Sequence, residues 1–77
     1  MTLTDLAPGE TATIASIDTA HPAVQRLMVL GLVEGAELTY VRASLGGDPL
    51  EFRLMGAAIS LRREQARQFR VTPVDRA

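Results

Sequence analysis

The side chains that could do chemistry in this sequence are few. There is one histidine, His21, there is no cysteine, and no serine lies in a Gly-x-Ser-x-Gly motif, so no nucleophile with a partner base can be assigned. The chain also contains no lysine, which excludes a P-loop because that loop uses a lysine to contact phosphates. We therefore expect a protein that is not an enzyme and that has no cofactor.

His21 could bind a metal ion together with Asp18 or Glu10. Non-haem ferrous iron sites often use two histidines and one carboxylate on one face of the metal, and one histidine does not complete that set within a single chain. We therefore assign no metal ligand. A metal-responsive module that uses His21 is kept as an alternative.

Arginines near the C-terminus could bind an anion such as phosphate. The group consists of Arg62, Arg63, Arg67 and Arg70. A run of charge on a short exposed turn is usually a solvated surface, and the net charge of −1 at pH 7 provides no global attraction to nucleic acid or to anionic lipid. We expect no nucleic-acid partner, and we keep a nucleic-acid-binding or phosphate-binding small barrel as an alternative.

Residues 24–40 organise the predicted fold, because their hydrophobic period changes in mid-run. Val24, Leu27, Met28 and Gly31 are spaced at i, i+3, i+4 and i+7. This spacing predicts one face of an amphipathic helix about two turns long. Gly31 is predicted to end the helix, because glycine can adopt the left-handed conformation that caps it.

The residues on either side of this helix agree with that interpretation. Pro22 fits the first helical position and places His21 at or near the N-cap. Residues 32–35 are predicted to form a tight turn in which Gly35 has positive φ. From Leu38 onward apolar and polar residues alternate, which predicts a strand from about 37 to 43.

Four further strands are predicted from alternation and turn residues. They span about 10–18, 50–54, 58–61 and 69–72, and residues 62–67 form about one helical turn. The first strand needs a bulge near Ala15 or Ser16 to keep its apolar residues on one face. Pro73 is expected to stop the last strand, because proline has no N–H to donate to the hydrogen-bond ladder. The side chains of Leu3 and Leu6, in the lead-in segment before the first strand, are expected to pack against the underside of the domain.

These elements predict a mainly β fold with one domain over residues 1–77. Five short strands, one short helix between the first two and a one-turn helix before the last suit a small, partly open barrel. We favour an SH3-like barrel over an OB-type barrel, whose helix would come later in the chain. No apolar run approaches the roughly 20 residues that span a bilayer, so we expect a cytoplasmic protein.

The predicted helix carries more apolar residues than one core can cover. Residues 27–30 are all apolar and sweep about 300° of the helix. Val29 should lie opposite the core face centred on Val24, Met28 and Gly31, with Leu30 at its margin. We hypothesise that Val29 and Leu30, with Arg26 at the rim, bind a partner. Alternatively, a second copy covers them, or Leu30 packs under the lead-in segment.

With these residues identified, the sequence resembles the FeoA family, the small cytosolic accessory proteins of bacterial ferrous iron uptake. The matching segments are residues 6–10, 26–35, 45–49 and 59–66, ahead of Val71. One departure is Glu34, where the family usually has proline; because proline presets φ in a type II turn, this turn should be less rigid here. The same domain also resembles the C-terminal module of iron-dependent repressors, although this chain contains no helix-turn-helix segment.

The resemblance implies an SH3-like barrel and a supporting role in ferrous iron uptake. The implied partner is the cytoplasmic portion of the membrane-embedded, G-protein-coupled ferrous iron transporter. The protein itself would not transport iron. We expect it in the cytoplasm, held at the inner face of the membrane through its partner, with a weak homo-oligomer as a further alternative.

Overall fold

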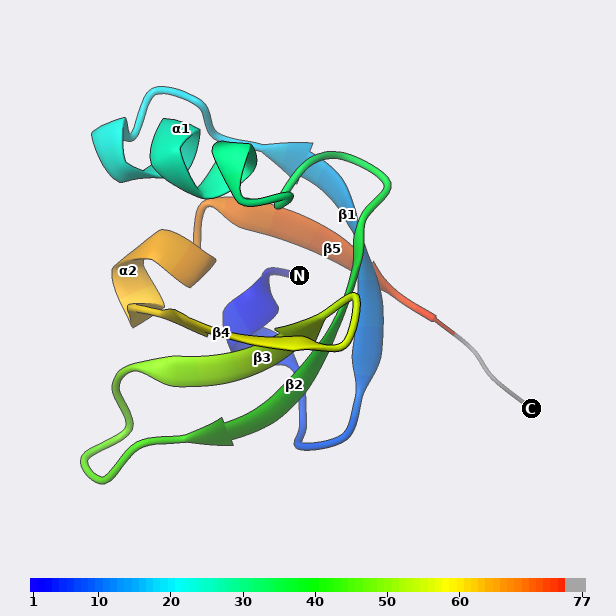
Figure 1. Cartoon of the computed structure of the whole chain (residues 1–77), viewed down its shortest axis with the longest axis vertical. Coiled ribbons are helices and arrows are strands. Elements are labelled where there is room, and N and C mark those ends of the chain that lie inside the picture. The colour runs from blue at the N-terminus through cyan, green and yellow to red at the C-terminus, as the bar shows by residue number, and fades with distance from the viewer. Residues whose placement is uncertain (75–77) are drawn as a thin grey trace.

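The computed structural model describes residues 1–74 as five antiparallel strands and three short helical segments (Figure 1). The strands are β1 (Thr11–Ile17), β2 (Glu37–Ala43), β3 (Leu50–Leu54), β4 (Ala57–Leu61) and β5 (Phe69–Pro73). The helical segments are the 3₁₀ turn η1 (Leu3–Asp5), α1 (Pro22–Val29) and α2 (Arg63–Ala66). The mainly β architecture, with one helix between the first two strands and one turn before the last, is confirmed.

The strands form one sheet in the order β4-β3-β2-β1-β5. Figure 1 shows this sheet curling around η1. The pairing shifts register between Ile14 and Ser16 in β1, and again between Tyr40 and Arg42 in β2. Bulges bend a strand and increase its twist, so these two irregularities help the sheet to curl. The first confirms the predicted bulge, and the second was not predicted.

The core lies inside the curled sheet and draws residues from every part of the chain. Its fully buried members include Leu3, Ile14, Leu32, Phe52 and Phe69. In β3 the residues alternate between the core and the outside, as the pattern of apolar residues predicted. Leu32 comes from the turn after α1 and is fully buried in this core.

The core face of α1 differs in one detail from the predicted face. Val24 and Leu27 are buried, whereas Met28 is only partly buried. The predicted centre on Met28 was therefore wrong, and the face lies nearer to Val24 and Leu27. The helix is short: it ends at Val29, so the core buries its Val24 and Leu27 side, and the next core residue is Leu32 in the turn that follows.

The outer edge of β5 is covered by the start of the chain. The Val71 N–H donates to the Met1 carbonyl at 3.0 Å, and Thr2 forms a bridge with Arg70. Leu3 and Leu6 are buried as predicted, although η1 was not predicted. β5 ends at Pro73, one residue later than the predicted range 69–72, because Pro73 itself still pairs with Ala12. The Val74 N–H then donates to the Thr11 carbonyl at 2.9 Å. Pro73 is tolerated because, like the Val71 N–H two residues earlier, its nitrogen faces away from β1.

Two glycines reverse the chain between α1 and β2. Gly31 has φ +111° and Gly35 has φ +89°, so both predictions of a left-handed glycine are confirmed. The Gly35 N–H donates to the Ile14 carbonyl at 2.8 Å, and the Ile14 N–H donates to the Ala36 carbonyl at 2.9 Å. These two hydrogen bonds attach the turn to the middle of β1.

We expect Gly35→Val to lower the free energy of unfolding by about 1 to 3 kcal/mol, because a β-branched residue is strained at positive φ. A Cβ at this position would meet no atom within 4 Å, so the loss would come from backbone strain and not from a clash. Gly35→Asn is the matched control, since asparagine tolerates this conformation. Chemical denaturation of the three proteins would measure the difference, and equal stability of the valine variant and the native protein would contradict the prediction.

Candidate docking surface

The predicted partner-binding residues lie at the C-terminal end of α1. Val29 is 86% exposed and Leu30 is 61% exposed, and Arg26 is exposed one turn earlier. Residues at i and i+4 lie on the same side of a helix, so Arg26 and Leu30 are neighbours. The predicted exposure of Val29 is confirmed, and Leu30 does not pack under the lead-in segment. That these three residues bind a partner stays a prediction.

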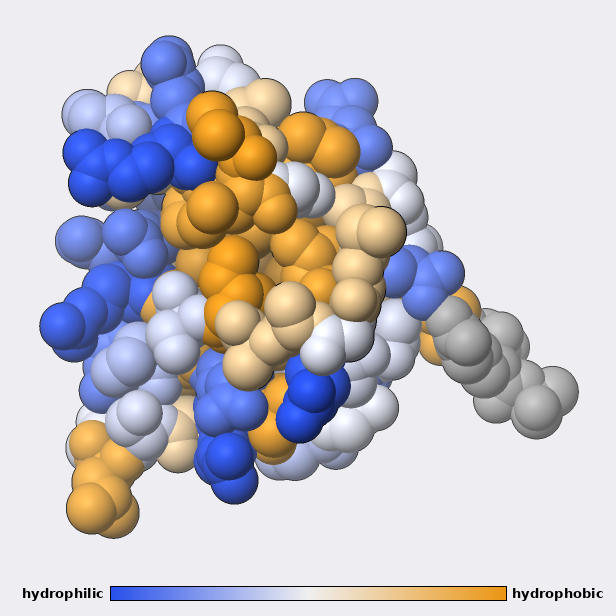
Figure 2. Space-filling view, viewed as in Figure 1, coloured by the Kyte–Doolittle hydropathy of each residue, from blue (hydrophilic) through white to orange (hydrophobic). Residues whose placement is uncertain are grey.

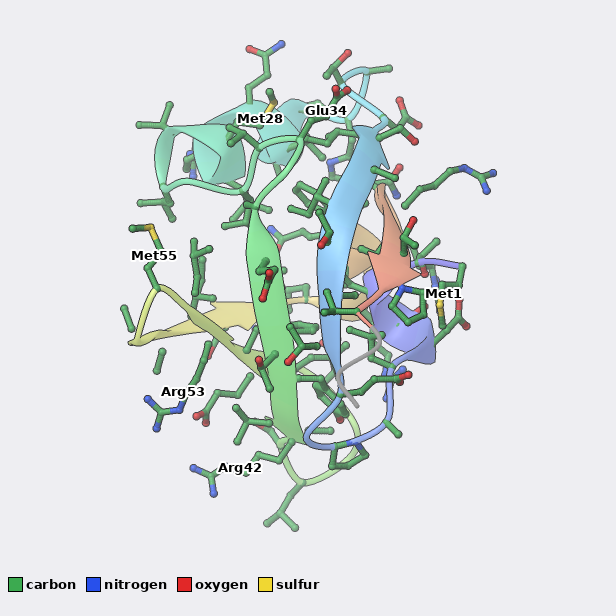
Figure 3. All side chains as sticks on the ribbon, turned by 90° about the vertical axis from the view of Figure 1, so that its right-hand side faces the viewer. Met1, Met28, Glu34, Arg42, Arg53 and Met55 are labelled. Carbon is green, nitrogen blue, oxygen red and sulfur yellow. The ribbon has the colours of Figure 1, made fainter. Side chains whose placement is uncertain are left out.

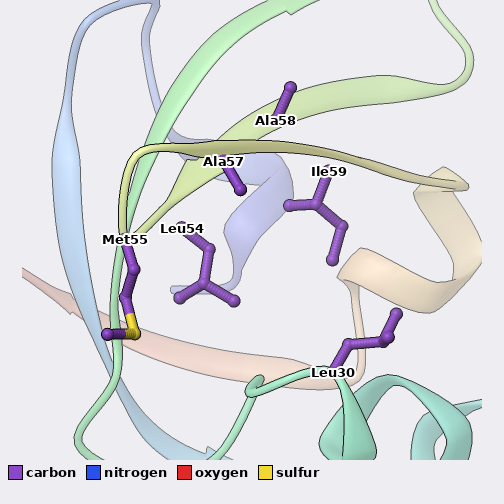
Figure 4. Close-up of a pocket in the computed structure, with 6 residues that line it drawn as sticks. All are labelled: Leu30, Leu54, Met55, Ala57, Ala58 and Ile59. Atoms are coloured by element: carbon purple, nitrogen blue, oxygen red, sulfur yellow. The ribbon is translucent and has the colours of Figure 1, made fainter.

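An open apolar pocket of about 320 Å³ continues this surface away from α1 (Figure 4). It is lined by Leu30, Leu54, Met55, Ala57, Ala58 and Ile59. Figure 2 shows a broad apolar area in the middle of this face of the molecule, between the elements that Figure 1 labels α1 and β4. The pocket residues of β3 and β4 were not predicted from the sequence, because the predicted partner-binding residues all lie on the helix.

Met55, which lines this pocket, is 97% exposed. It lies with Gly56 in a two-residue turn between β3 and β4, and both residues have positive φ, +52° and +82°. This is a type I′ hairpin turn, whose first position usually holds asparagine, aspartate or glycine. Figure 3 shows Met55 at the tip of the hairpin, on the same side of the molecule as α1. The signal in the sequence was the Met-Gly pair between two apolar strands.

The arginine group is not assembled into one site. The Arg63 Nε donates to the Gly47 carbonyl at 2.6 Å, and the Arg63 N–H donates to Asp48 Oδ1 at 3.0 Å. Arg63 therefore braces the loop between β2 and β3. Arg62, Arg67 and Arg70 are exposed at the start of α2, at its end and on β5. Anion binding by this group stays a prediction.

His21 is the N-cap of α1, as predicted, and its Nδ1 accepts a hydrogen bond from the Ala23 N–H at 3.2 Å. Within residues 1–74, no three histidine, aspartate or glutamate side chains are grouped so that they could hold a metal ion. Over the same residues, no helix has the length and apolar character needed to cross a membrane.

The chain was compared with known protein families and structures. The model of the FeoA domain matches residues 1–73. The solution structure of the FeoA protein from Chlorobium tepidum is 38% identical, with a TM-score of 0.87, and the match covers 97% of this chain and 71% of that chain. The crystal structure of FeoA from Stenotrophomonas maltophilia, solved in complex with zinc, is 32% identical, with a TM-score of 0.80 and coverage of 94% and 89%.

The Stenotrophomonas protein is described as a prokaryotic SH3 domain protein, so the predicted SH3-like barrel is confirmed and the OB-type barrel is set aside. A curated relative, from Porphyromonas gingivalis, is a fusion of Fe(2+) transport protein A with the Fe(2+) transporter FeoB. It is 32% identical over 71 residues, which are 92% of this chain but only 8% of the fusion protein. By its sequence, its sheet topology and these matches, the chain belongs to the FeoA family.

Proposed function

We propose that this protein is a small accessory protein of bacterial ferrous iron uptake that binds the cytoplasmic portion of the membrane ferrous iron transporter. The observation that carries this proposal is the Porphyromonas fusion, in which a segment similar to 92% of this chain is joined to a FeoB transporter. A fusion keeps two proteins together permanently. Separate chains that act together need a docking surface instead.

The end of α1 has the composition of such a surface. Val29 and Leu30 are adjacent apolar residues that are both exposed, and burying one valine or leucine side chain contributes about 1.5 to 3 kcal/mol. Arg26 adds a cation at the rim, and arginine beside an apolar anchor is common in binding hot spots. The proposed docking surface is therefore Arg26, Val29 and Leu30.

The location of the protein follows from this partner. The protein would be cytoplasmic and would lie at the inner face of the membrane only while it is bound. Self-association through the same apolar residues would compete with docking, and any such oligomer is expected to be weak.

We expect Val29→Asp to abolish association with the transporter while the fold is kept. Val29 is almost fully exposed, so the substitution removes little core contact, and an acidic residue near a helix C-terminus costs only about 0.3 to 1 kcal/mol. Leu45→Asp is the matched control, because Leu45 is a fully exposed apolar residue on the loop between β2 and β3. Co-purification of the transporter from membranes with each variant measures the effect.

If folded Val29→Asp protein still co-purifies with the transporter, the docking surface is placed wrongly. The exposed arginines, Arg62, Arg67 and Arg70, then become the next candidate. Salt dependence distinguishes the two surfaces, because binding of phosphate by arginine weakens steeply as salt is added whereas apolar docking does not.

A titration of ferrous iron into the isolated protein under anaerobic conditions is expected to show no tight stoichiometric site. One ring nitrogen of His21 already accepts the hydrogen bond that caps α1, and one histidine is a poor match for a facial iron site. Calorimetry would detect binding at micromolar affinity or better. Binding of that strength that is lost in His21→Ala would contradict the prediction and favour a metal-responsive role.

A further inference from the structure

The two outer edges of the sheet differ in how they are protected. The edge of β5 carries a proline, Pro73, and is covered by Met1 and Thr2. In residues 1–74, β4 pairs with β3 alone and no strand lies on its other side. The β4 edge is therefore the place where the sheet can accept a further strand.

The register of the hairpin identifies which backbone groups face this edge. The two-residue turn is closed by the pair Leu54 and Ala57, and pairing continues without a shift to Leu50 and Leu61. Hydrogen-bonded pairs alternate along an antiparallel ladder, starting at the residues that close a two-residue turn. Ala58 and Ser60 therefore occupy the positions whose N–H and C=O groups point away from β3, and both residues are exposed.

The β4 strand contains no charged residue, no proline and no bulge. Exposed edges are normally interrupted by a charged residue, a proline or a bulge. The five residues of β4 are Ala-Ala-Ile-Ser-Leu, and their pairing with β3 is regular. An uncharged, regular edge of this kind favours a partner in extended conformation, because only an extended chain matches its alternating donors and acceptors.

The apolar pocket lies directly beside this edge. Figure 4 shows Ala57 and Ile59 of β4 pointing into the pocket, with Leu30 at the end of α1 facing them across it. A side chain from an added strand would therefore enter an apolar space of about 320 Å³. At the far end of β4, Arg62 is exposed and follows Leu61 directly, and no ion pair within the described residues engages its guanidinium.

We propose that the β4 edge binds an extended segment of the transporter's cytoplasmic portion as an added strand. One apolar side chain of that segment fills the pocket, and a carboxylate further along it pairs with Arg62. This inference rests on the proposed function and states how the partner is held: by backbone hydrogen bonds to Ala58 and Ser60, next to the docking surface at the end of α1. Leu30 belongs to both sites and connects them.

Hydrogen exchange of the backbone amides tests strand addition directly. In the free protein, the amides of Ala58 and Ser60 should exchange faster than those of Ile59 and Leu61, which lie at positions bonded to β3. On addition of the transporter in lipid nanodiscs, exchange at Ala58 and Ser60 should slow by about tenfold or more, because each amide gains a backbone hydrogen bond. Unchanged exchange at both positions in a complex that forms would overturn the proposal.

A proline substitution tests the same contacts by a second route. Ser60→Pro removes the outward N–H, and proline is tolerated at edge positions whose N–H faces solvent. We expect association with the transporter to weaken about tenfold or more, whereas Ser60→Ala, which keeps the N–H, should bind like the native protein. If thermal melting shows that Ser60→Pro does not fold, Ala58→Pro replaces it, and the exchange measurement on the native protein remains decisive.

The two proposals can fail separately. If Val29→Asp loses the transporter while folded Ser60→Pro binds normally, strand addition is wrong and docking through α1 stands. If Ser60→Pro and Ser60→Ala bind equally weakly, the serine hydroxyl and not the backbone edge is responsible, and strand addition is again wrong. If both Val29→Asp and Ser60→Pro bind normally, both proposals fail. A last outcome concerns the isolated protein at increasing concentration. If exchange at Ala58 and Ser60 then becomes slower, a second copy of this chain occupies the edge, and the proposal that the transporter binds there is wrong.

Discussion

The backbone of Ile14 holds this fold together at the point where the helix returns to the sheet. Its N–H and C=O bond to Ala36 and Gly35, so the turn after α1 is fastened to the middle of β1. This attachment requires a left-handed backbone at position 35, which glycine adopts without strain. The turn that it fastens also carries Leu32, which is buried in the core. The position of the exposed helix end thus depends on the backbone geometry of the turn as well as on the apolar residues of the helix.

The arrangement places an apolar helix end and an open strand edge on one side of the molecule. Monomeric proteins rarely leave large apolar areas in contact with water without a use for them. Here the area is built from two rigid parts, the capped helix α1 and the regular β3–β4 hairpin. A partner would meet a preformed surface, which lowers the entropy lost on binding. Met55 adds a flexible side chain at its rim, and methionine adapts to irregular apolar shapes.

Most elements of the fold could be predicted from the sequence, because their signals are local. Pro22, Gly31 and Gly35 mark the helix and its turn, and strict alternation in residues 50–54 marks β3. The exposure of Val29 followed from helical spacing. The pocket could not be predicted in this way, because Leu30 and Ile59 meet only when the whole sheet has curled. The same limit applies to Arg63, whose guanidinium braces the loop at Gly47. It applies also to the bulge in β2, which helps the sheet to curl and was not predicted.

The position of β5 has a consequence for how the chain folds. This strand lies between Thr2 on one side and β1 on the other. Residues 2 and 70, which are far apart in the sequence, are therefore neighbours in the sheet. Phe69 and Val71 complete the core from this strand. A nascent chain therefore cannot close the barrel until residues 69–73 have been synthesised. Until then, the core residues of the earlier strands stay partly exposed to water. Contacts between such distant residues slow folding relative to helical proteins of the same size, and β1 stays open to incorrect pairing until the last strand arrives.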